Sequence, residues 1–398
     1  MITISERVQA LAPAATLAMA QKSAELRQQG IDVISLAVGE PDFPTPDFIK
    51  EAAKKAIDDN FSHYSPVPGY MSLRRAIADN LYETNRVEYL PEQIVVSTGA
   101  KQALCNTILA LVNPGDEVII PTPAWVSYVE MVKLAEGKSV LVETHMEQNF
   151  KLSPEQLESA ITPRTRMIIL CSPSNPSGAV YTREELEGLV EVFMRHPDVI
   201  ILSDEIYQHI NYTGSYTSMG SFQEISDRTI VINGVSKAYA MTGWRIGFVA
   251  APIEVAKAVT KLQGQYTSGT SSIAQKAAEG AYTGPQDCVL EMCEAFRRRR
   301  DLVVAMAKNI PGWELNTPDG AFYIFPRVKQ LLGKTTPKGK TIATSGDLVM
   351  YLLEEAHVAT VDGAAFCLPG YIRLSYAASD EDLVNALNRI QTAVTALR

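Results

Sequence analysis

Short runs of β-branched and aliphatic residues alternate with longer amphipathic stretches along much of this chain of 398 residues. The runs fall at residues 94–96, 118–120, 167–170, 199–202, 229–232 and 246–249. Apolar runs of strand length that alternate with helical segments are typical of an α/β domain with a mostly parallel central sheet covered by helices. Two helix starts fit this pattern, because residues 153–156 and 182–185 each read as a cap followed by an acidic first turn. The sequence therefore predicts the α/β fold class.

The alternation of short apolar runs with amphipathic stretches changes near residue 290, where a long charged helix is expected. An apolar segment at 320–325, a helix near 346–356 and a strand at 372–376 follow it. This change predicts a second, smaller α+β domain. The lysine-, threonine- and glycine-rich stretch 333–345 has no periodicity and is expected to be a surface loop, with a lid over a site as the alternative.

Charge and cysteine usage exclude several classes of partner. The formal net charge of -9, without a long basic run, argues against nucleic acid or an anionic membrane as the main partner. The arginines at 297–300 sit among acidic residues in a helical pattern, so we expect a solvated, salt-bridged helix face there. Five scattered cysteines, with no C-x-x-C pair, predict neither disulfides nor zinc, and the five histidines show no metal-binding pattern.

The location predicted for the chain is the cytoplasm. No segment approaches the roughly 18 uninterrupted apolar residues of a membrane span. The first residues lack the charged start and apolar run of a signal peptide, and the unpaired cysteines suit a reducing compartment.

Polar residues follow several of the predicted strands, where ligands of parallel sheets bind. The small-residue turn at 97–102 opens a helix whose amides suit a phosphate, although turns of this kind favour small residues in any case. Asn175 lies in a proline-bracketed turn and either faces a ligand or is an ordinary turn residue. Asp204 ends a buried strand and should meet a cation, such as a protonated ring nitrogen, or else cap a helix.

Lys237 and Arg245 lie in a segment of small residues just before an apolar run. A lysine becomes a nucleophile near neutral pH when burial or a nearby positive charge lowers its pKa. An arginine supplies such a charge and also forks onto a phosphate. The pair therefore fits a Schiff base to a phosphate-bearing aldehyde cofactor, and the alternative is a surface lysine beside a snorkelling arginine.

Together these segments resemble the class I pyridoxal-phosphate aminotransferases of fold type I, and most closely the bacterial aspartate aminotransferases of the Ib subgroup. The resemblance covers nearly the whole chain and is most specific in the Gly-Glu-Pro-Asp-Phe and Ser-Lys…Gly-Trp-Arg motifs. The matching residues are 39–43, Tyr64, 99–101, Trp125, 174–178, 204–207, 236–247 and Arg373. The resemblance implies a large cofactor-binding domain at 46–289, a small domain at 290–398 and an N-terminal segment, 1–45, that packs with the small domain.

The resemblance also implies a role for each residue around the cofactor, pyridoxal 5'-phosphate. Lys237 would hold it as an internal aldimine and later move a proton between the substrate α-carbon and the cofactor C4′. Asp204 would keep the ring nitrogen protonated, so that the ring can accept electrons. Asn175 and Tyr207 would hydrogen-bond the ring oxygen, and Trp125 would stack on the ring.

The phosphate of the cofactor would be held by one set of groups from this chain and one from a partner. The residues implied are Gly99, Ala100, Lys101, Ser236 and Arg245, with Tyr64 reaching over from a neighbouring subunit of a homodimer. Ala100 departs from the family pattern, which has a second glycine there, and alanine fits the turn only with a negative φ.

Amino acid and 2-oxo acid substrates would be bound through a carboxylate at each end. Arg373 would bind the α-carboxylate, helped by Asn175 and the backbone of Gly39, next to Trp125. Lys101 and Thr16 would read a second carboxylate.

The expected reaction is aspartate:2-oxoglutarate transamination, a ping-pong reaction through pyridoxamine phosphate, with prephenate or glutamate as further substrates. The alternatives are transamination of other amino acids, β-lyase chemistry on the same scaffold, or a non-enzymatic regulator.

Overall fold

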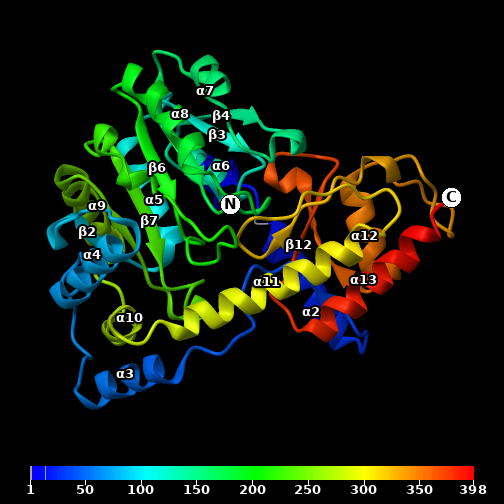
Figure 1. Cartoon of the computed structure of the whole chain (residues 1–398), viewed down its shortest axis with the longest axis horizontal. Helices are drawn as coiled ribbons and strands as arrows, with labels where there is room; N and C mark the ends of the chain where they lie inside the picture. Colours follow the sequence, from blue (N-terminus) through cyan, green and yellow to red (C-terminus); the bar gives the residue numbers. More distant parts are fainter. Residues whose placement is uncertain (1, 14) are drawn as a thin grey trace.

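A seven-stranded sheet forms the centre of the larger part of the molecule in a computed structural model that describes residues 2–13 and 15–398 (Figure 1). Its strand order is β2-β8-β7-β6-β5-β3-β4. β8 runs antiparallel to β2 and β7, and the other neighbours are parallel. The strands are β2 (Ile94–Ser97), β3 (Glu117–Thr122), β4 (Lys138–Glu143), β5 (Thr165–Cys171), β6 (Ile200–Asp204), β7 (Thr229–Gly234) and β8 (Gly247–Ala250). The predicted α/β class with a mostly parallel sheet is confirmed.

Helices cover both faces of this sheet, so its central strands are buried throughout. Successive residues of one strand face opposite sides: Val118 and Ile120 pack with α5, α6 and α9, whereas Ile119 packs with α7 and α8. These helices are α5 (Gly99–Leu111), α6 (Ser127–Leu134), α7 (Pro154–Ala160), α8 (Arg183–Arg195) and α9 (Ile253–Tyr266). A further core lies between β2, β8 and the helices α3 (Asp47–Asp58), α4 (Met71–Asn85) and α10 (Ser272–Thr283).

The two predicted helix caps are confirmed. Ser153 accepts a hydrogen bond from the backbone N–H of Gln156, and Thr182 accepts one from that of Glu185. In both cases the third helical residue bonds back to the cap, which satisfies two of the free N–H groups at each helix start.

The second part of the molecule is built from segments near both ends of the chain. β9 (Tyr323–Ile324), β12 (Ile372–Ser375) and β11 (Val361–Asp362) form an antiparallel sheet, and β1 (Ile34–Ser35) pairs in parallel with β10 (Val358–Ala359). The helices here are α2 (Ala15–Gln28), α12 (Ser345–Glu355) and α13 (Asp380–Thr395). The helix expected near 346–356 and the strand expected at 372–376 are confirmed, and the domain boundaries at residues 45 and 289 stay a prediction.

One long helix, α11 (Asp287–Ala307), runs from beside α10 toward α12 and so links the two parts (Figure 1). The remaining helix α1 (Glu6–Gln9) is tied to the turn just after α6 by the ion pair between Arg7 and Glu136. Single-turn 3₁₀ helices lie at Pro91–Gln93, Met146–Gln148, Met219–Ser221, Gln223–Ile225, Thr242–Trp244, Lys329–Leu331 and Gly363–Phe366. Within the described part of the chain, no helix combines the length and apolarity that spanning a membrane requires.

The expectation of a solvated arginine face at 297–300 is wrong for Arg299. Its side chain is buried and forks onto the carboxylate of Asp42, with Asp380 as a second partner. Arg300 is largely covered as well, since it stacks over the ring of Tyr212 and donates to the carbonyl of Pro318. The amphipathic pattern located the helix correctly but could not show that the segment around Asp42 covers its arginine face.

The 333–345 loop forms contacts within itself, with the C-terminal residue and with α12. Thr335 pairs with Thr341 and with the backbone of Arg398, and Lys338 pairs with Glu355. It contributes no residue to the pocket described below.

Candidate active site

A cavity of about 330 Å³ opens at the carboxyl ends of β5 and β6. It brings together all the predicted site residues except Gly99 and Tyr64, although they come from segments far apart in the sequence. The predicted residues that line it are Thr16, Gly39, Ala100, Lys101, Trp125, Asn175, Asp204, Tyr207, Ser236, Lys237, Arg245 and Arg373.

Lys237 follows β7 and extends into the cavity. Its Nζ donates to the carbonyl oxygen of Gly39 at 2.7 Å. Desolvation lowers the pKa of Lys237 to about 8, with further lowering by Arg373 and Arg245, while Glu40 and Asp204 oppose the shift. The free amine is therefore the minor form at pH 7 and the major form above pH 8, which makes Lys237 a better nucleophile near neutral pH than an ordinary lysine.

Asp204 ends β6 and is buried. Its Oδ2 accepts a hydrogen bond from the hydroxyl of Tyr128 at 2.6 Å, and its Oδ1 accepts one from the N–H of Ile206. Burial raises the pKa of Asp204 to about 6, although these two hydrogen bonds and Lys237 lower it. No helix starts after Asp204, so the alternative of a helix cap is wrong. A carboxylate in this setting gains most from a cationic group facing it, such as a protonated ring nitrogen.

Arg373 lies on β12 and is only 2% exposed. It donates to Asn175 Oδ1 at 3.0 Å and to the carbonyl of Ala37, and its guanidinium lies over the ring of Tyr323 at 4.5 Å. Its Nε has no partner, and within residues 2–13 and 15–398 its hydrogen bonds go to an amide oxygen and a carbonyl, with no carboxylate among its partners. A buried guanidinium without a counter-ion is a site for an anion.

The start of α5 forms a cradle beside Arg245. Gly99 has a φ of +78°, and a Cβ there would lie 2.3 Å from a terminal nitrogen of Arg245. A Cβ at Gly247 would lie 2.2 Å from the amide nitrogen of Ala100. The first amides of α5 lack side-chain caps and, with Ser236 and Arg245, suit a phosphate. The φ of Ala100 is not positive, so the alanine fits this turn without strain.

Lys101, which is exposed, and Thr16, which is half-buried, also line the cavity. Lys101 Nζ is 5.0 Å from the centre of the Trp125 ring. Partial desolvation and the charge of Arg245 lower the pKa of Lys101. Since no acidic residue faces it within the lining of the cavity apart from Asp204, the lysine is available to a negatively charged ligand group.

Two tyrosines of the site were not predicted from the sequence. The Tyr128 hydroxyl bonds Asp204, and the Tyr323 hydroxyl lies 2.7 Å from that of Tyr207. Tyr128 lies in α6 and Trp125 precedes that helix, so their spacing of three residues gave no signal that Tyr128 belongs to the site. Tyr323 lies in the apolar segment 320–325 and nothing distinguished it from a core residue.

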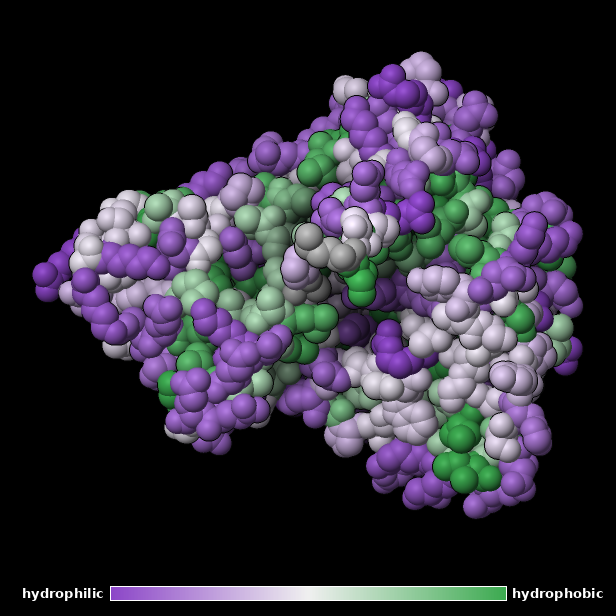
Figure 2. Space-filling model, turned by 180° about the vertical axis from the view of Figure 1, so that it is seen from behind, coloured by the Kyte–Doolittle hydropathy of each residue, from purple (hydrophilic) through white to green (hydrophobic). Residues whose placement is uncertain are grey.

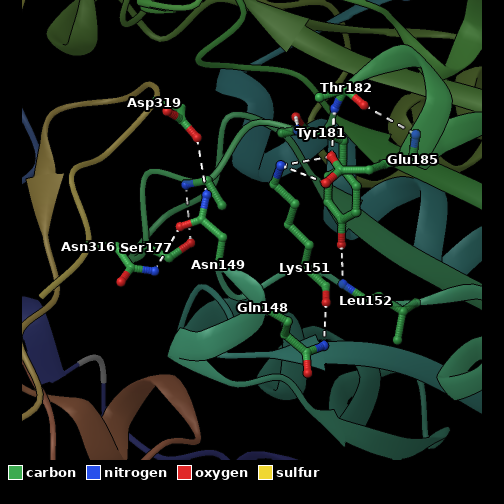
Figure 3. Close-up of polar contacts among 12 residues, drawn as sticks. Gln148, Asn149, Lys151, Leu152, Ser177, Tyr181, Thr182, Glu185, Asn316 and Asp319 are labelled. Atoms are coloured by element: carbon green, nitrogen blue, oxygen red, sulfur yellow. Dashed lines mark hydrogen bonds and ion pairs between the residues drawn. The ribbon is translucent and has the colours of Figure 1, made fainter.

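A polar network supports the turn that carries Asn175 (Figure 3). The carbonyl of Gly178, in that turn, accepts hydrogen bonds from the N–H groups of Asp319 and Gly320. Asn149 donates to the Asp319 carboxylate at 3.1 Å and accepts from Asn316 at 2.8 Å. The turn is thus fixed to the segment that leads into β9 and Tyr323.

Tyr64 does not reach this cavity. Its side chain is 98% exposed. Within the described residues, no group of three or more histidine, cysteine or acidic side chains is placed to hold a metal ion. The half-buried His209, whose pKa is lowered to about 4 by desolvation, fits a packing role.

The fold and the donor set of this cavity define a pyridoxal-phosphate enzyme of fold type I. A buried aspartate, a lysine with a lowered pKa and an anion cradle at a helix start are the groups that the ring nitrogen, aldehyde and phosphate of this cofactor need. The family "Aminotransferase class I and II" matches residues 31–390, and the chain belongs to it.

Several proteins are similar to this chain over nearly their whole length. The probable aspartate/prephenate aminotransferase of Rhizobium leguminosarum bv. phaseoli is 49% identical over 98% of each chain, and the aspartate/prephenate aminotransferase of Cereibacter sphaeroides is 49% identical over 100% of each. The crystal structure of the aspartate aminotransferase from Rhizobium meliloti matches with a TM-score of 0.97 and 45% identity, covering 100% of both chains. The aspartate aminotransferase of Thermus thermophilus with maleate matches with a TM-score of 0.93 and 42% identity, covering 99% of this chain and 100% of that one.

Proposed function

We propose that this aminotransferase moves the amino group between aspartate and 2-oxoglutarate in a ping-pong reaction. The observation that carries the proposal is the presence in one cavity of two cationic groups, Arg373 and Lys101, in addition to Lys237 and Arg245, which would serve the cofactor. Two cations match the two carboxylates of these substrates, and an apolar substrate would leave Lys101 without a partner. The similar structure from Thermus thermophilus, solved with the dicarboxylic acid maleate, supports this assignment.

Lys237 and Asp204 would act on the cofactor. Pyridoxal phosphate supplies an aldehyde that condenses with amines and an electron-poor ring that takes up negative charge. Lys237 would hold it covalently until the amino acid displaces the amine, and the freed amine would then carry the proton between the substrate α-carbon and the cofactor C4′. Asp204 would neutralise the protonated ring nitrogen, and Asn175 and Tyr207 would donate to the ring oxygen.

The remaining residues would bind and orient. The amides of Gly99, Ala100 and Lys101, with Ser236 and Arg245, would hold the phosphate. Trp125 would cover the ring face.

Substrate binding would rest on three groups around the reacting carbon. Arg373 would take the α-carboxylate bidentately, helped by Asn175 and the backbone of Gly39. Thr16 would assist Lys101 at the distal carboxylate.

We also propose a homodimer in the cytoplasm. The exposed Tyr64 would complete the phosphate site of a partner subunit, which explains an aromatic side chain facing solvent in the single chain. The face seen in Figure 2 is mostly hydrophilic, with apolar residues gathered in patches. Among the described residues, the exposed large apolar side chains include Met71 and Tyr266. All five cysteines are free, which suits a reducing compartment.

Prephenate is the second candidate amino acceptor. Several relatives of this chain carry both aspartate and prephenate in their names. Prephenate also has two carboxylates, so Arg373 and Lys101 could bind it in the same way. Glutamate would use the same pair of cations. Other amino donors, or β-elimination on the same scaffold, would have no use for Lys101.

A panel of amino donors against 2-oxoglutarate, oxaloacetate and prephenate tests the proposal. We expect the dicarboxylic pairs to give the highest kcat/KM values. The purified protein should show a visible absorption band of the bound cofactor, and Lys237→Ala should lose both the band and the activity. A higher kcat/KM for an apolar donor than for aspartate, or a colourless wild type supplied with cofactor, would overturn it.

A further inference from the structure

Residues 36–43, here called the crossing segment, pass over the cavity from β1 toward α3. The backbone of Leu36 donates to Ala359 at 2.9 Å and accepts from Ser375 at 2.8 Å, so this end is fixed to the strands around Arg373. The middle of the segment lies against Tyr323, because a Cβ on Gly39 would fall 1.9 Å from the tyrosine hydroxyl. The segment therefore approaches the site closely through its backbone.

Two carbonyl groups of the crossing segment accept hydrogen bonds from Lys237 and Arg373. Gly39 accepts from Lys237 at 2.7 Å, and Ala37 accepts from a terminal nitrogen of Arg373. A carbonyl oxygen at hydrogen-bond distance stabilises the charged form of the lysine. The position of the segment thus affects both the proton affinity of Lys237 and the orientation of Arg373.

The other end of the crossing segment is held by Arg299 of α11. Its terminal nitrogens lie 2.7 and 2.9 Å from the two oxygens of Asp42, in a bidentate pair. The guanidinium also lies 5.0 Å from the ring centre of Phe43. Its Nε is 3.2 Å from Asp380, an exposed residue at the start of α13. A partly buried fork of this kind fixes geometry more strictly than a single contact.

We propose that Arg299 is a positioning residue for the transamination assigned above. Its fork on Asp42 sets the crossing segment so that the Gly39 and Ala37 carbonyls meet Lys237 and Arg373. The arginine acts through this segment and does not line the cavity. Because Arg373 would take the α-carboxylate that every amino acid carries, loosening the segment affects all donors equally.

The test uses Asp42→Asn, Arg299→Gln and the double variant that carries both of these changes. The control is Asp380→Asn, which removes the other partner of the same arginine. Asp42→Asn preserves size at a partly exposed position, so it keeps the fold. We expect each of the first two to raise the KM for aspartate and for alanine by about tenfold, the size of one lost charged hydrogen bond. The double variant should be no worse than either single one, and Asp380→Asn should stay within about twofold of the wild type.

A second readout uses the cofactor-free chain and does not depend on turnover. The pH at which Lys237 is half-labelled by an amine-reactive reagent should fall in Asp42→Asn and Arg299→Gln, because the ammonium loses the Gly39 carbonyl. An unchanged labelling midpoint and KM with only a lower melting temperature, or an equal effect of Asp380→Asn, would show a merely structural role. A wild type without transaminase activity would refute the proposed function, whereas the labelling midpoint would still decide the role of Arg299.

Discussion

The hydroxyl of Tyr128 lies 2.6 Å from Oδ2 of Asp204, in a buried hydrogen bond between α6 and the end of β6. This bond lowers the pKa of Asp204 and so opposes the effect of burial, which raises it. The tyrosine thereby helps to keep the carboxylate ionised, while the other oxygen, Oδ1, accepts from the N–H of Ile206.

Tyr128→Phe should weaken cofactor binding. Loss of a hydrogen bond to a carboxylate costs about 1.5 kcal/mol, or roughly a tenfold rise in the Kd of pyridoxal phosphate. Absorbance titration of the cofactor-free variant measures this. Tyr181→Phe is the matched control, because its hydroxyl accepts from the N–H of Leu152 instead. Equal affinities of Tyr128→Phe and the wild type would mean that the tyrosine only fills space.

The lowered pKa of Lys237 predicts a pH-dependent reactivity in the cofactor-free protein. Because the pKa is lowered to about 8, the free amine becomes the major form as the pH rises through 8. The rate of labelling by an amine-reactive reagent, followed by mass spectrometry of the peptide that contains Lys237, should be half-maximal near that pH. A rate that keeps rising to well above pH 9 would contradict the burial-induced shift, and Lys237→Ala gives the background.

Lys101→Ala should change substrate preference more than overall activity. Removing the cation should raise the KM for aspartate by at least about tenfold, as expected for a lost charged contact, and leave that for an apolar amino acid nearly unchanged. Steady-state kinetics with both donors measures the difference. An equal rise for both would assign Lys101 to the cofactor phosphate instead.

Glu205, next to Asp204, predicts a pH dependence of stability. The side chain is fully buried and accepts from Ser203 and Ser218, and burial raises its pKa from 4.5 to about 7. The folded protein therefore binds this proton more tightly than the unfolded chain does. Its favourable contribution is complete below the unfolded pKa and is lost as the pH rises through 7.

The raised pKa of Glu205 also predicts how much the free energy of unfolding changes with pH, and Glu205→Gln tests this amount. Between about pH 5.5 and pH 8.5 the free energy of unfolding should fall by about 2 kcal/mol through this residue alone. Chemical unfolding of the cofactor-free wild type and of Glu205→Gln at both pH values measures the difference. The glutamine variant should lose this part of the pH dependence, and identical slopes for both proteins would show that Glu205 ionises freely in the fold.

The strands and caps were predictable because their signals are local. The apolar runs that became β5 and β6 are buried on both faces, and the caps at Ser153 and Thr182 depend on residues three positions away. Lys237 and Asp204 were candidates because of their positions beside predicted strands, whereas Arg373 was found only through the motif resemblance. The structure places them in one cavity, but their chemical roles remain a proposal.

The covered arginine and the two tyrosines could not be predicted, since each depends on what packs against it. Arg299 looked solvated because its own helix is charged, and Asp42, more than two hundred residues earlier in the chain, is what buries its charge. Tyr323 differs from a core tyrosine only through its contact with Tyr207. Long-range partners of this kind are absent from any local pattern.

The pairing of β1 with β10 has a consequence for how the protein is made. All strands of the seven-stranded sheet have left the ribosome once residue 250 has emerged, so that sheet can form early. Residues Ile34 and Leu36, which the finished protein buries, must wait for residues 358–359 before they find their neighbours. During synthesis this apolar N-terminal stretch therefore lacks its strand partner for almost the whole time of elongation, and unpaired apolar strands of this kind are prone to aggregate.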